Sequence, residues 1–589
     1  MSLDAWTAIS VVLTIFPLMA LSRLGPDIIL LGAVMLLLVL GVLSPEEALG
    51  GFSHSGLFTV ACMYVLVAGI RETGGIDLLV RHVLGRPRSE RRALLRLLVP
   101  VATLSGLLNN TPIVAAYLPA VLSWSRRLGM SPRRFLLPLS FASILGGTIT
   151  LFGTSTNLVV YGLLRERYPA LDMGLFDLAW VGIPVALAGL FYLLTVAPML
   201  LPRGGGASQA FANPREFTIE MEVDARGPLA ERTVVEAGLR HLRELFLVEI
   251  ERAGNIVSVV GPGEVLKGGD RLVFAGTRSA AVELQQIRGL LPSRDPHSNL
   301  KTAFKERRLV EVVVSRQCQF IGQRIRDGRF RTLYGAVVLA ICRGGERVTG
   351  NLGSVRLQPA DVLLLEVRPP FLARHRQSRE FLLVSELDGA ARPAHEKAPL
   401  AWGILFGVAG LAAFGITSLL NAAVTGAAAA LLTGCCSVAS AKRSLDVQVL
   451  LTIAAAFGVG AALTGSGAAK TLADAVISLS SGSPWLLLFC VYLTVALLTE
   501  VVTNNAAAVI MFPVAMSAAE SLGVSPMPFV VALMFAASTS FLTPLGYQTN
   551  LMVYGPGGYQ LRDFLRVGSG LNLLTAAIAL TLIPLIWPF

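Results

Sequence analysis

The sequence predicts an α-helical polytopic membrane protein, made of two inverted-topology repeats with a polar α+β segment inserted between them. Three observations lead to this fold class. Only 15% of the 589 residues are charged and 54% are hydrophobic, whereas soluble proteins carry about 25% charged residues. The apolar residues gather in two long segments that repeat each other. Arginines gather in particular loops, which assigns an orientation to the spans.

Composition divides the chain into three segments. Residues 1–202 form a first membrane repeat, residues 203–398 are polar and strand-like, and residues 399–589 form a second membrane repeat. The polar segment begins with Pro202, Arg203 and three glycines, which is typical of a loop. The apolar N-terminal stretch has neither a positively charged leader nor a small-residue cleavage site, so we expect a membrane span there rather than a signal peptide.

The two membrane segments repeat each other at a nearly constant offset. The first contains LLNNTPIVAAYLP and LFGTSTNLVVYG, and the second contains VVTNNAAAVIMFP and PLGYQTNLMVYG. Pro119 pairs with Pro513 at an offset of 394, and Asn157 pairs with Asn550 at an offset of 393. An offset that holds over about 50 residues indicates a duplicated membrane unit, as is found in many secondary transporters.

Arginines orient the first repeat. Seven of them lie between residues 71 and 96, and four more lie at residues 126–134, just after the apolar stretch 97–125. Because cytoplasmic loops are enriched in Lys and Arg, this stretch begins and ends on the cytoplasmic side. It is therefore expected to be a re-entrant hairpin, whose polar middle at Asn109 to Pro112 is buried in protein or lines a cavity.

The second repeat contains an equivalent hairpin that is expected to enter from outside. The apolar stretch 484–520 has a polar middle, and its flanking loops contain a single basic residue, Lys470. Each repeat also has a helix that polar residues interrupt, at Gly153 to Asn157 and at the related GYQTN. The alternation of spans places residues 203–398 in the cytoplasm and both termini outside, in the inner or plasma membrane.

The polar segment contains a second repeat. The runs LVEIERAGNIVS and LKGGDRLVFAG return as VLAICRGGERVTG and LQPADVLLLEV, so that Arg252 pairs with Arg343 and Asp270 with Asp361 at an offset of 91. Both aspartates are expected to stabilise turns. The copies, at about 217–290 and 304–385, resemble the TrkA-C domain (RCK C-terminal domain), a small α+β module. This resemblance implies a small regulatory ligand, and no nucleotide is expected because no Gly-x-Gly-x-x-Gly follows a strand.

The hairpin tips Asn109-Asn110-Thr111 and Thr503-Asn504-Asn505 predict a binding site for a solute. Unpaired N–H groups at helix N-termini favour anions, and nearby carbonyl and side-chain oxygens coordinate cations. The tips contain no Lys, Arg or His. Such a site can hold an anion if bound cations supply the positive charge, which is a physical reason to expect coupling to sodium.

The tips and interrupted helices resemble those of the divalent anion:sodium symporter (DASS) family over both membrane segments. The family's tip motif is Ser-Asn-Thr, and its central Asn stands here as Asn110 and Asn504. The resemblance implies one sodium ion between each tip and the interrupted helix of the same repeat. The implied sodium ligands are Ser105, Asn109, Asn110 and Gly153 for the first ion, and Thr499, Val502, Asn504 and Gly546 for the second. The implied anion-binding residues are Asn109, Asn110, Thr111, Thr154, Thr503, Asn504, Asn505, Tyr547 and Gln548.

The stretch PLGYQTNLMVYGPGGY, together with the paired TrkA-C-like copies, is similar to the sulfate-type branch of that family. The resemblance implies sodium-driven symport of sulfate by an elevator-type movement in a homodimer surrounded by membrane lipid. Dicarboxylates and other oxyanions or sulfonates stay open as alternatives. Glu500 lies next to the second tip, where the first repeat has Gly106. It is interpreted either as a proton carrier or as a capping group.

The sequence gives less support to other classes of protein than to a symporter. An RCK-gated channel is disfavoured because no TVGYG-like filter is present, and a transporter-like sulfur sensor without flux stays open. The six cysteines and six histidines are dispersed, so we expect neither a disulfide framework nor a heavy-metal site. No nucleophile–base pattern or phosphate loop indicates an enzyme. The net charge of +11 comes with arginines in loops beside the spans, so nucleic acid is not an expected partner.

Overall fold

The computed structural model describes most of both membrane segments and part of the polar segment. The predicted linker from Pro202 to Gly206, together with Arg86 and Arg88 of the arginine run, lies outside the described residues. The described residues are 2–21, 24–85, 87, 89–201, 218–239, 242, 246–252, 255–257, 263–275, 284, 287–292, 308–315, 317–325, 330–344, 346–348, 352–367, 371, 380–386, 395–544 and 546–589.

Both membrane segments are helical. The helices of the first are α1 (Leu3–Leu21), α2 (Pro26–Val39), α3 (Pro45–Gly50), α4 (Ser55–Glu72), α5 (Gly75–Leu84), α6 (Glu90–Ser105), α7 (Asn110–Arg127), α8 (Arg133–Gly147), α9 (Ser155–Arg167), α10 (Ala179–Thr195) and α11 (Ala197–Leu200). The helices of the second are α17 (Ala398–Ala413), α18 (Leu419–Leu432), α19 (Val438–Ser444), α20 (Val447–Gly465), α21 (Ala468–Leu479), α22 (Pro484–Thr499), α23 (Asn504–Leu522), α24 (Met527–Ser538), α25 (Gln548–Gly557) and α26 (Leu561–Ile586).

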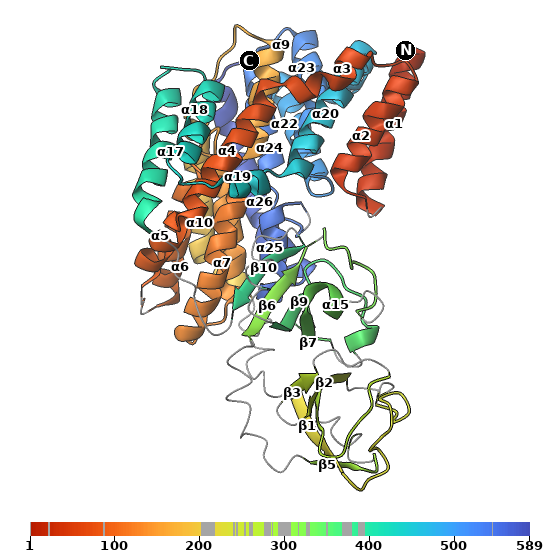
Figure 1. Cartoon of the computed structure of the whole chain (residues 1–589). Helices are drawn as coiled ribbons and strands as arrows, with labels where there is room; N and C mark the ends of the chain where they lie inside the picture. The colour runs from red at the N-terminus through yellow and green to blue at the C-terminus, as the bar shows by residue number, and fades with distance from the viewer. Residues whose placement is uncertain are drawn as a thin grey trace.

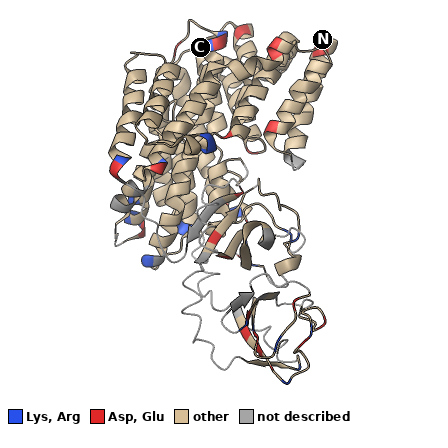
Figure 2. Ribbon diagram, in the orientation of Figure 1, with Lys and Arg blue, Asp and Glu red and all other residues tan. Residues whose placement is uncertain are grey.

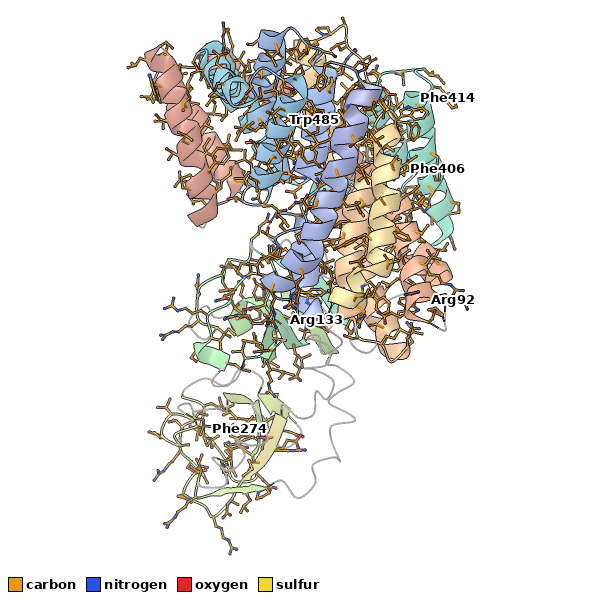
Figure 3. All side chains as sticks on the ribbon, turned by 180° about the vertical axis from the view of Figure 1, so that it is seen from behind. Arg92, Arg133, Phe274, Phe406, Phe414 and Trp485 are labelled. Carbon is orange, nitrogen blue, oxygen red and sulfur yellow. The ribbon has the colours of Figure 1, made fainter. Side chains whose placement is uncertain are left out.

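These helices have the character of a membrane protein. Within the described residues, five helical stretches are long and apolar enough to cross a membrane by length and composition: Pro45–Glu72, Ala179–Leu200, Val447–Gly465, Asn504–Leu522 and Leu561–Ile586. Large apolar side chains such as Phe406 of α17 and Phe414, just after this helix, lie on the outer surface (Figure 3). Charged residues are sparse along the helices and gather near their ends and in the polar segment (Figure 2). Such a surface suits a lipid bilayer.

Each predicted hairpin is a pair of helices joined by a short loop. Residues 106–109 separate α6 from α7, and residues 500–503 separate α22 from α23. The helices that follow the loops begin at Asn110 and Asn504, the central residues of the two tips. In Figure 1, α6 and α7 lie toward the strand-rich segment, whereas α22 and α23 lie toward the opposite end of the helical region.

The interrupted helices differ from the prediction in where they break. The first helix was expected to break at Gly153 to Asn157, but α8 ends at Gly147 and α9 already begins at Ser155. The break therefore lies at residues 148–154, and Ser155 to Asn157 form the first turn of α9. The physical reason is that Thr154 caps this helix, since its side chain accepts the N–H of Thr156. The equivalent break separates α24 from α25 at residues 539–547.

One asparagine in each repeat satisfies carbonyl groups of the break. Nδ2 of Asn157 donates to the carbonyl oxygens of Gly147 at 3.4 Å and Thr150 at 3.0 Å. Nδ2 of Asn550 donates to the carbonyl oxygens of Ser540 at 3.0 Å and of Thr543 at 3.2 Å. Both side chains thus reach back by the same ten and seven residues. Because buried carbonyls are costly when unpaired, these two residues stabilise an irregular backbone inside the helical region.

The described part of the polar segment contains two antiparallel sheets of the same design. The strands are β1 (Thr218–Val223), β2 (Phe246–Arg252), β3 (Asn255–Val257), β4 (Arg271–Ala275) and β5 (Leu290–Pro292), then β6 (Arg308–Val314), β7 (Ala336–Arg343), β8 (Glu346–Arg347), β9 (Val362–Val367) and β10 (Phe381–Glu386). The first sheet has the order β3-β2-β4-β1-β5. The second sheet, read from its other edge, has the order β8-β7-β9-β6-β10, so each of the strands β6 to β10 takes the place of its counterpart among β1 to β5. The likeness of the two copies to TrkA-C stays a prediction.

The repeated Arg and Asp residues of the two sheets form matching ion pairs. Nε and Nη2 of Arg252 donate to Asp270 at 2.9 and 2.8 Å, and the same atoms of Arg343 donate to Asp361 at 2.8 and 2.9 Å. These hydrogen bonds raise the pKa of both arginines above the usual value for arginine. Each aspartate also accepts the N–H of the residue three positions earlier, which confirms the predicted turn role.

The second sheet packs directly on the membrane segment. Val313, Ala340 and Val362 share one apolar core with the membrane helices. A Cβ placed on Gly555 of α25 would lie 2.2 Å from the carbonyl oxygen of Ala360. Figure 1 shows α25 beside the sheet that contains β6, β9 and β10. The second sheet therefore touches the far end of a helix whose first residue, Gln548, is a predicted anion ligand.

Candidate functional site

Hydrogen bonds connect the two hairpin tips with the start of each interrupted helix. Nδ2 of Asn110 donates to Oη of Tyr547 at 2.6 Å, and Oγ1 of Thr111 donates to Oε1 of Gln548 at 3.3 Å. On the other side, Oγ1 of Thr156 donates to Oδ1 of Asn505 at 2.9 Å. These contacts gather the N-terminal ends of α7, α9, α23 and α25. Helix N-termini present N–H groups and partial positive charge, so this place can bind an anion.

The two interrupted helices also meet each other. Thr154 and Tyr547 stand immediately before α9 and α25, and their hydroxyl oxygens are 3.2 Å apart. Both side chains are buried. Thr503 stands in the same position before α23, where its side chain accepts the N–H of Ala506. The hydroxyl groups of Thr154, Thr503 and Tyr547 thus all belong to residues that immediately precede a helix.

The tips contact the opposite repeat as well as their own. We expected each tip to face the interrupted helix of the same repeat. A Cβ on Gly147 would indeed lie 2.6 Å from Oδ1 of Asn110, so the first tip touches its own α8. The hydrogen bonds to Tyr547 and from Thr156, however, cross between repeats. The reason is that the two interrupted helices begin side by side, so a tip that reaches one of them also approaches the other.

The first predicted sodium set is partly brought together. Oγ of Ser105 donates to Oδ1 of Asn110 at 2.5 Å, and both residues are buried. Gly153 lies against the backbone of Gly147, because an added Cβ would be 2.4 Å from the Gly147 carbonyl oxygen. Asn109 is half-buried, and its side chain has no hydrogen-bond partner among the described residues. Its amide group therefore remains available to a bound ion.

Of the second predicted sodium set, Thr499 lies beside Gly546. An added Cβ there would lie 2.9 Å from the carbonyl oxygen of Thr499 and 3.0 Å from Oε2 of Glu500. Only glycine fits between these oxygen atoms, which are the ligands that hard cations prefer. Asn504 is half-buried, and among the described residues its side chain makes no hydrogen bond. Val502 is buried and forms a backbone hydrogen bond to Leu498.

Glu500 caps the second break. Its Oε1 accepts the N–H of Leu542 at 3.0 Å, and its Oε2 accepts the N–H of Thr543 at 2.9 Å. Oγ1 of Thr543 in turn donates to the Glu500 carbonyl at 3.2 Å. In the first repeat, Oγ1 of Thr150 donates in the same way to the carbonyl of Gly106. The backbone arrangement is therefore repeated, and the carboxylate is an addition of the second repeat.

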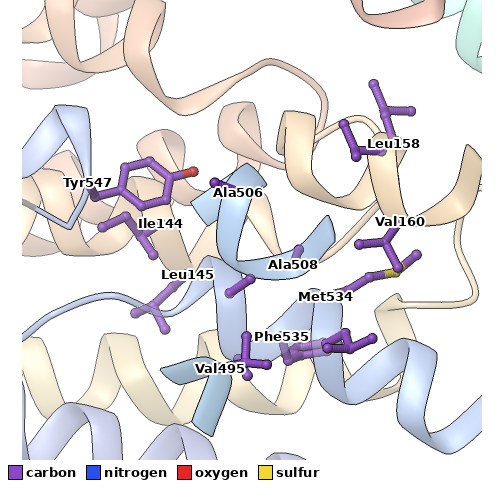
Figure 4. Close-up of a cluster of buried hydrophobic side chains, with 14 of the residues drawn as sticks. Ile144, Leu145, Leu158, Val160, Val495, Ala506, Ala508, Met534, Phe535 and Tyr547 are labelled. Carbon is purple, nitrogen blue, oxygen red and sulfur yellow. The ribbon is translucent and has the colours of Figure 1, made fainter. Parts of the chain in front are cut away.

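Sequence reasoning missed several polar residues of this region. Ser155 and Thr156 contact Asn505, and Ser140 donates to Oδ1 of Asn550 at 2.7 Å. Ser155 and Thr156 follow Thr154 directly in GTSTN, so the internal repeat could have revealed them. Ser140 lies within apolar α8 and had no such signal. Tyr547 also belongs to a buried apolar cluster that includes Ile144, Leu145, Ala506 and Ala508 (Figure 4).

The chain is similar to known membrane transporters. The citrate transporter family (CitMHS) matches residues 16–523 and 422–589 of the chain. A Chlamydomonas reinhardtii protein named "Putative sulfur deprivation response regulator" is 36% identical, over 94% of this chain and 96% of its own length. An uncharacterized transporter of Synechocystis is 35% identical, over 94% and 92%. Sodium/sulfate cotransporter 2 of C. reinhardtii is 28% identical, over 96% and 87%.

These matches span both membrane segments and the polar segment between them. The family and the relatives named as transporters are not enzymes. The site described above also contains groups that bind ions, namely helix N-termini, amides and backbone carbonyls. The chain therefore belongs to the citrate transporter family of multi-pass membrane transporters.

Proposed function

We propose that this protein is a sodium-coupled symporter of a divalent anion, and that the anion is sulfate. The observation that carries the proposal is the gathering of four helix N-termini by the Asn110–Tyr547, Thr111–Gln548 and Thr156–Asn505 hydrogen bonds. Neither tip contains a basic side chain, so backbone and amide N–H groups bind the anion. Relatives named sodium/sulfate cotransporters support both sulfate and sodium.

Sodium has a physical role in such a site. Two sodium ions balance the charge of one divalent anion in a place that has no lysine or arginine of its own. The oxygen atoms around Gly546, including the Thr499 carbonyl, and the amides of Asn109 and Asn504 are suitable ligands. A further sodium ion would give the transported complex a net charge, and each net charge moved contributes about 2.3 kcal/mol per 100 mV of membrane potential.

The geometry of Glu500 favours sodium over protons as the coupling ion. Both of its carboxylate oxygens accept backbone N–H groups. An ionised carboxylate only accepts hydrogen bonds, whereas a protonated one carries an O–H that must find an acceptor. Protonation would therefore oppose one of these two bonds. We assign Glu500 a capping role that positions Gly546 and the Thr499 carbonyl.

We further propose that the two repeats are inverted, that substrate crosses by an elevator-type movement, and that the protein is a homodimer. The opposite positions of the two hairpins in Figure 1 support inversion. The polar segment is proposed to be a cytoplasmic pair of TrkA-C domains that respond to a small ligand, with both termini outside. The equal strand order of its two sheets supports the duplicated module.

A second candidate function is a sulfate sensor that binds its anion without flux. The relative named as a sulfur deprivation response regulator favours it, because the two chains match over nearly their whole lengths. The binding site would be the same in both cases. Only the presence of net transport distinguishes the two functions, so flux and binding must be measured on the same preparation.

The test is uptake of labelled sulfate into proteoliposomes, with and without an inward sodium gradient. We expect sodium to increase uptake at least tenfold, and a proton gradient alone to have no effect. Asn110→Ala and Asn504→Ala should reduce uptake to the level of empty liposomes, since each removes an amide from the site. Asn421→Ala is the matched control, because Asn421 is exposed on α18, away from the tips.

Three results would contradict parts of this proposal. Full uptake in both tip variants would contradict the proposed location of the site. Uptake that follows a pH gradient but does not depend on sodium would contradict sodium as the coupling ion. Sulfate binding without uptake would favour the sensor. Competition by unlabelled citrate and succinate tests the anion, because the name of the family refers to a carboxylate.

A further inference from the structure

The two repeats differ in size at one position of the site. Gly153-Thr154 in the first repeat corresponds to Gly546-Tyr547 in the second, at the offset of 393 that also relates Asn157 to Asn550. Thr154 and Tyr547 stand immediately before α9 and α25. A small hydroxyl side chain in one repeat is thus replaced by a phenol in the other. The two sides of the duplicated site therefore differ in the size of this side chain.

The phenol of Tyr547 extends across the boundary between the repeats. Its Oη lies 2.6 Å from Nδ2 of Asn110 and 3.2 Å from Oγ1 of Thr154, both in the first repeat. The side chain is 6% exposed. A threonine at this position would end several bonds earlier and would leave the volume of the ring empty. The ring therefore lies between Asn110 of the first tip and the start of α25, whereas the equivalent place before α9 has only the smaller side chain of Thr154.

The hydrogen bonds hold the ring in place. Nδ2 of Asn110 donates to Oη, and Oδ1 of the same amide accepts from Ser105, so the amide is oriented on both sides. One hydroxyl proton forms the Thr154–Tyr547 bond. The other hydroxyl proton of this pair has no acceptor among the described residues and remains for a bound anion. The ring of Tyr547 is thus held in a fixed position, and the Thr154–Tyr547 pair offers one hydroxyl donor to a bound anion.

We propose that Tyr547 determines the size of the anion, because its ring fills the space that the second carboxylate of a longer dianion would need. This inference rests on the proposed divalent-anion site and specifies what that site selects. Sulfate carries both charges around one central atom, whereas succinate spreads them over a four-carbon chain. Steric exclusion by a buried side chain that is hydrogen-bonded at its far end is strong, because the ring cannot move aside without breaking its bond to Asn110.

Two substitutions separate the volume of the ring from its hydroxyl group. Tyr547→Thr restores the residue of the first repeat and removes the ring, whereas Tyr547→Phe keeps the ring and removes the hydroxyl. Binding is measured on the full-length protein in detergent as the shift in thermal unfolding caused by sulfate, malonate, succinate or glutarate, in the presence of sodium. Uptake of labelled sulfate and succinate is measured in proteoliposomes of the same preparations.

For the unchanged protein we expect affinity to fall along the series from sulfate to glutarate. Tyr547→Thr should improve the affinity for succinate relative to sulfate at least tenfold and should permit uptake of succinate. Tyr547→Phe should keep the preference for sulfate while it weakens sulfate binding several-fold, because Asn110 loses its acceptor. Equal affinities for sulfate and succinate in the unchanged protein would overturn the inference. So would an unaltered ratio in Tyr547→Thr, or an equal change of the ratio in Tyr547→Phe.

The binding readout keeps this inference separate from the symport proposal. A size preference that Tyr547→Thr abolishes, in a protein without flux, would support the role of Tyr547 and contradict symport. Sodium-driven sulfate uptake with a ratio that Tyr547→Thr leaves unaltered would support symport and contradict the role of Tyr547. If Tyr547→Thr fails to fold, the Tyr547→Phe protein decides the question. A Tyr547→Phe protein that folds and binds all four anions equally would contradict the inference.

Discussion

Arg343→Met is expected to destabilise the second sheet by about 3–5 kcal/mol, because it leaves the charge of Asp361 buried without its partner. The Asp361 side chain is 0% exposed and accepts two hydrogen bonds from Arg343. Methionine keeps the length of the aliphatic stem, so the loss is mainly the ion pair. The N–H of Gln358, at 2.8 Å from Oδ2, is the contact that remains.

Hydrogen–deuterium exchange of the full-length protein is the suitable measurement, because it reports on each sheet separately, whereas thermal unfolding reports on the whole chain. Peptides from β7 and β9 should exchange faster in Arg343→Met, whereas peptides from β2 and β4 should not change. Arg252→Met should produce the reverse pattern, since Arg252 makes the same pair with Asp270.

Glu346→Gln is the control for this experiment, because Glu346 lies exposed on β8 of the same sheet. Exposed charges contribute little to stability, and its exchange should match that of the unchanged protein. Unchanged protection of β9 in Arg343→Met would show that the pair is dispensable. The second sheet also touches α25 at Gly555, so we expect its loosening to lower the proposed sulfate uptake. Loosening of the first sheet should affect the proposed uptake less.

Gly146→Ala is expected to be among the most damaging single-methyl changes in the helical region. An added Cβ would lie 2.1 Å from the carbonyl oxygen of Ala102 and 2.7 Å from its Cα. These are backbone atoms, so α6 and α8 must move apart. Overpacking of this kind costs about 1–3 kcal/mol, and more when the backbone has to shift. Gly147, next in the chain, lies against the amide of Asn110, so the displacement reaches the site.

The measurement combines thermal unfolding of the purified protein with sulfate uptake. Gly146→Ala should lower both, and Gly146→Leu should prevent recovery of a monodisperse protein. Gly403→Ala is the matched control, because an added Cβ on Gly403 in α17 meets nothing within 4 Å. A stable and active Gly146→Ala protein would mean that α6 and α8 are not in backbone contact.

Local polarity located the tips but only the last residues of each break. Asn110 and Asn504 were recognised because amides interrupt apolar stretches at the same position of two repeats, and α7 and α23 begin at these residues. The break between α8 and α9 was expected several residues too late. Its first residues include Ile149, Leu151 and Phe152, which have no polar signal in the sequence. The irregular backbone there depends on the amide of Asn157, which is a contact of the folded chain.

By itself the sequence predicted the membrane character of the chain, the polar residues at which α7 and α23 begin, and the duplicated strands. Composition and repeats are enough for these, since they depend on local hydropathy and on residues that recur at fixed offsets. Only the tertiary structure decided which groups meet in the site. Asn110 and Tyr547 are 437 residues apart, and Arg343 pairs with Asp361 across a sheet. Such pairs form because packing brings helix N-termini and strands together that are separated along the chain. The order of residues alone does not show which of them become neighbours in the folded protein.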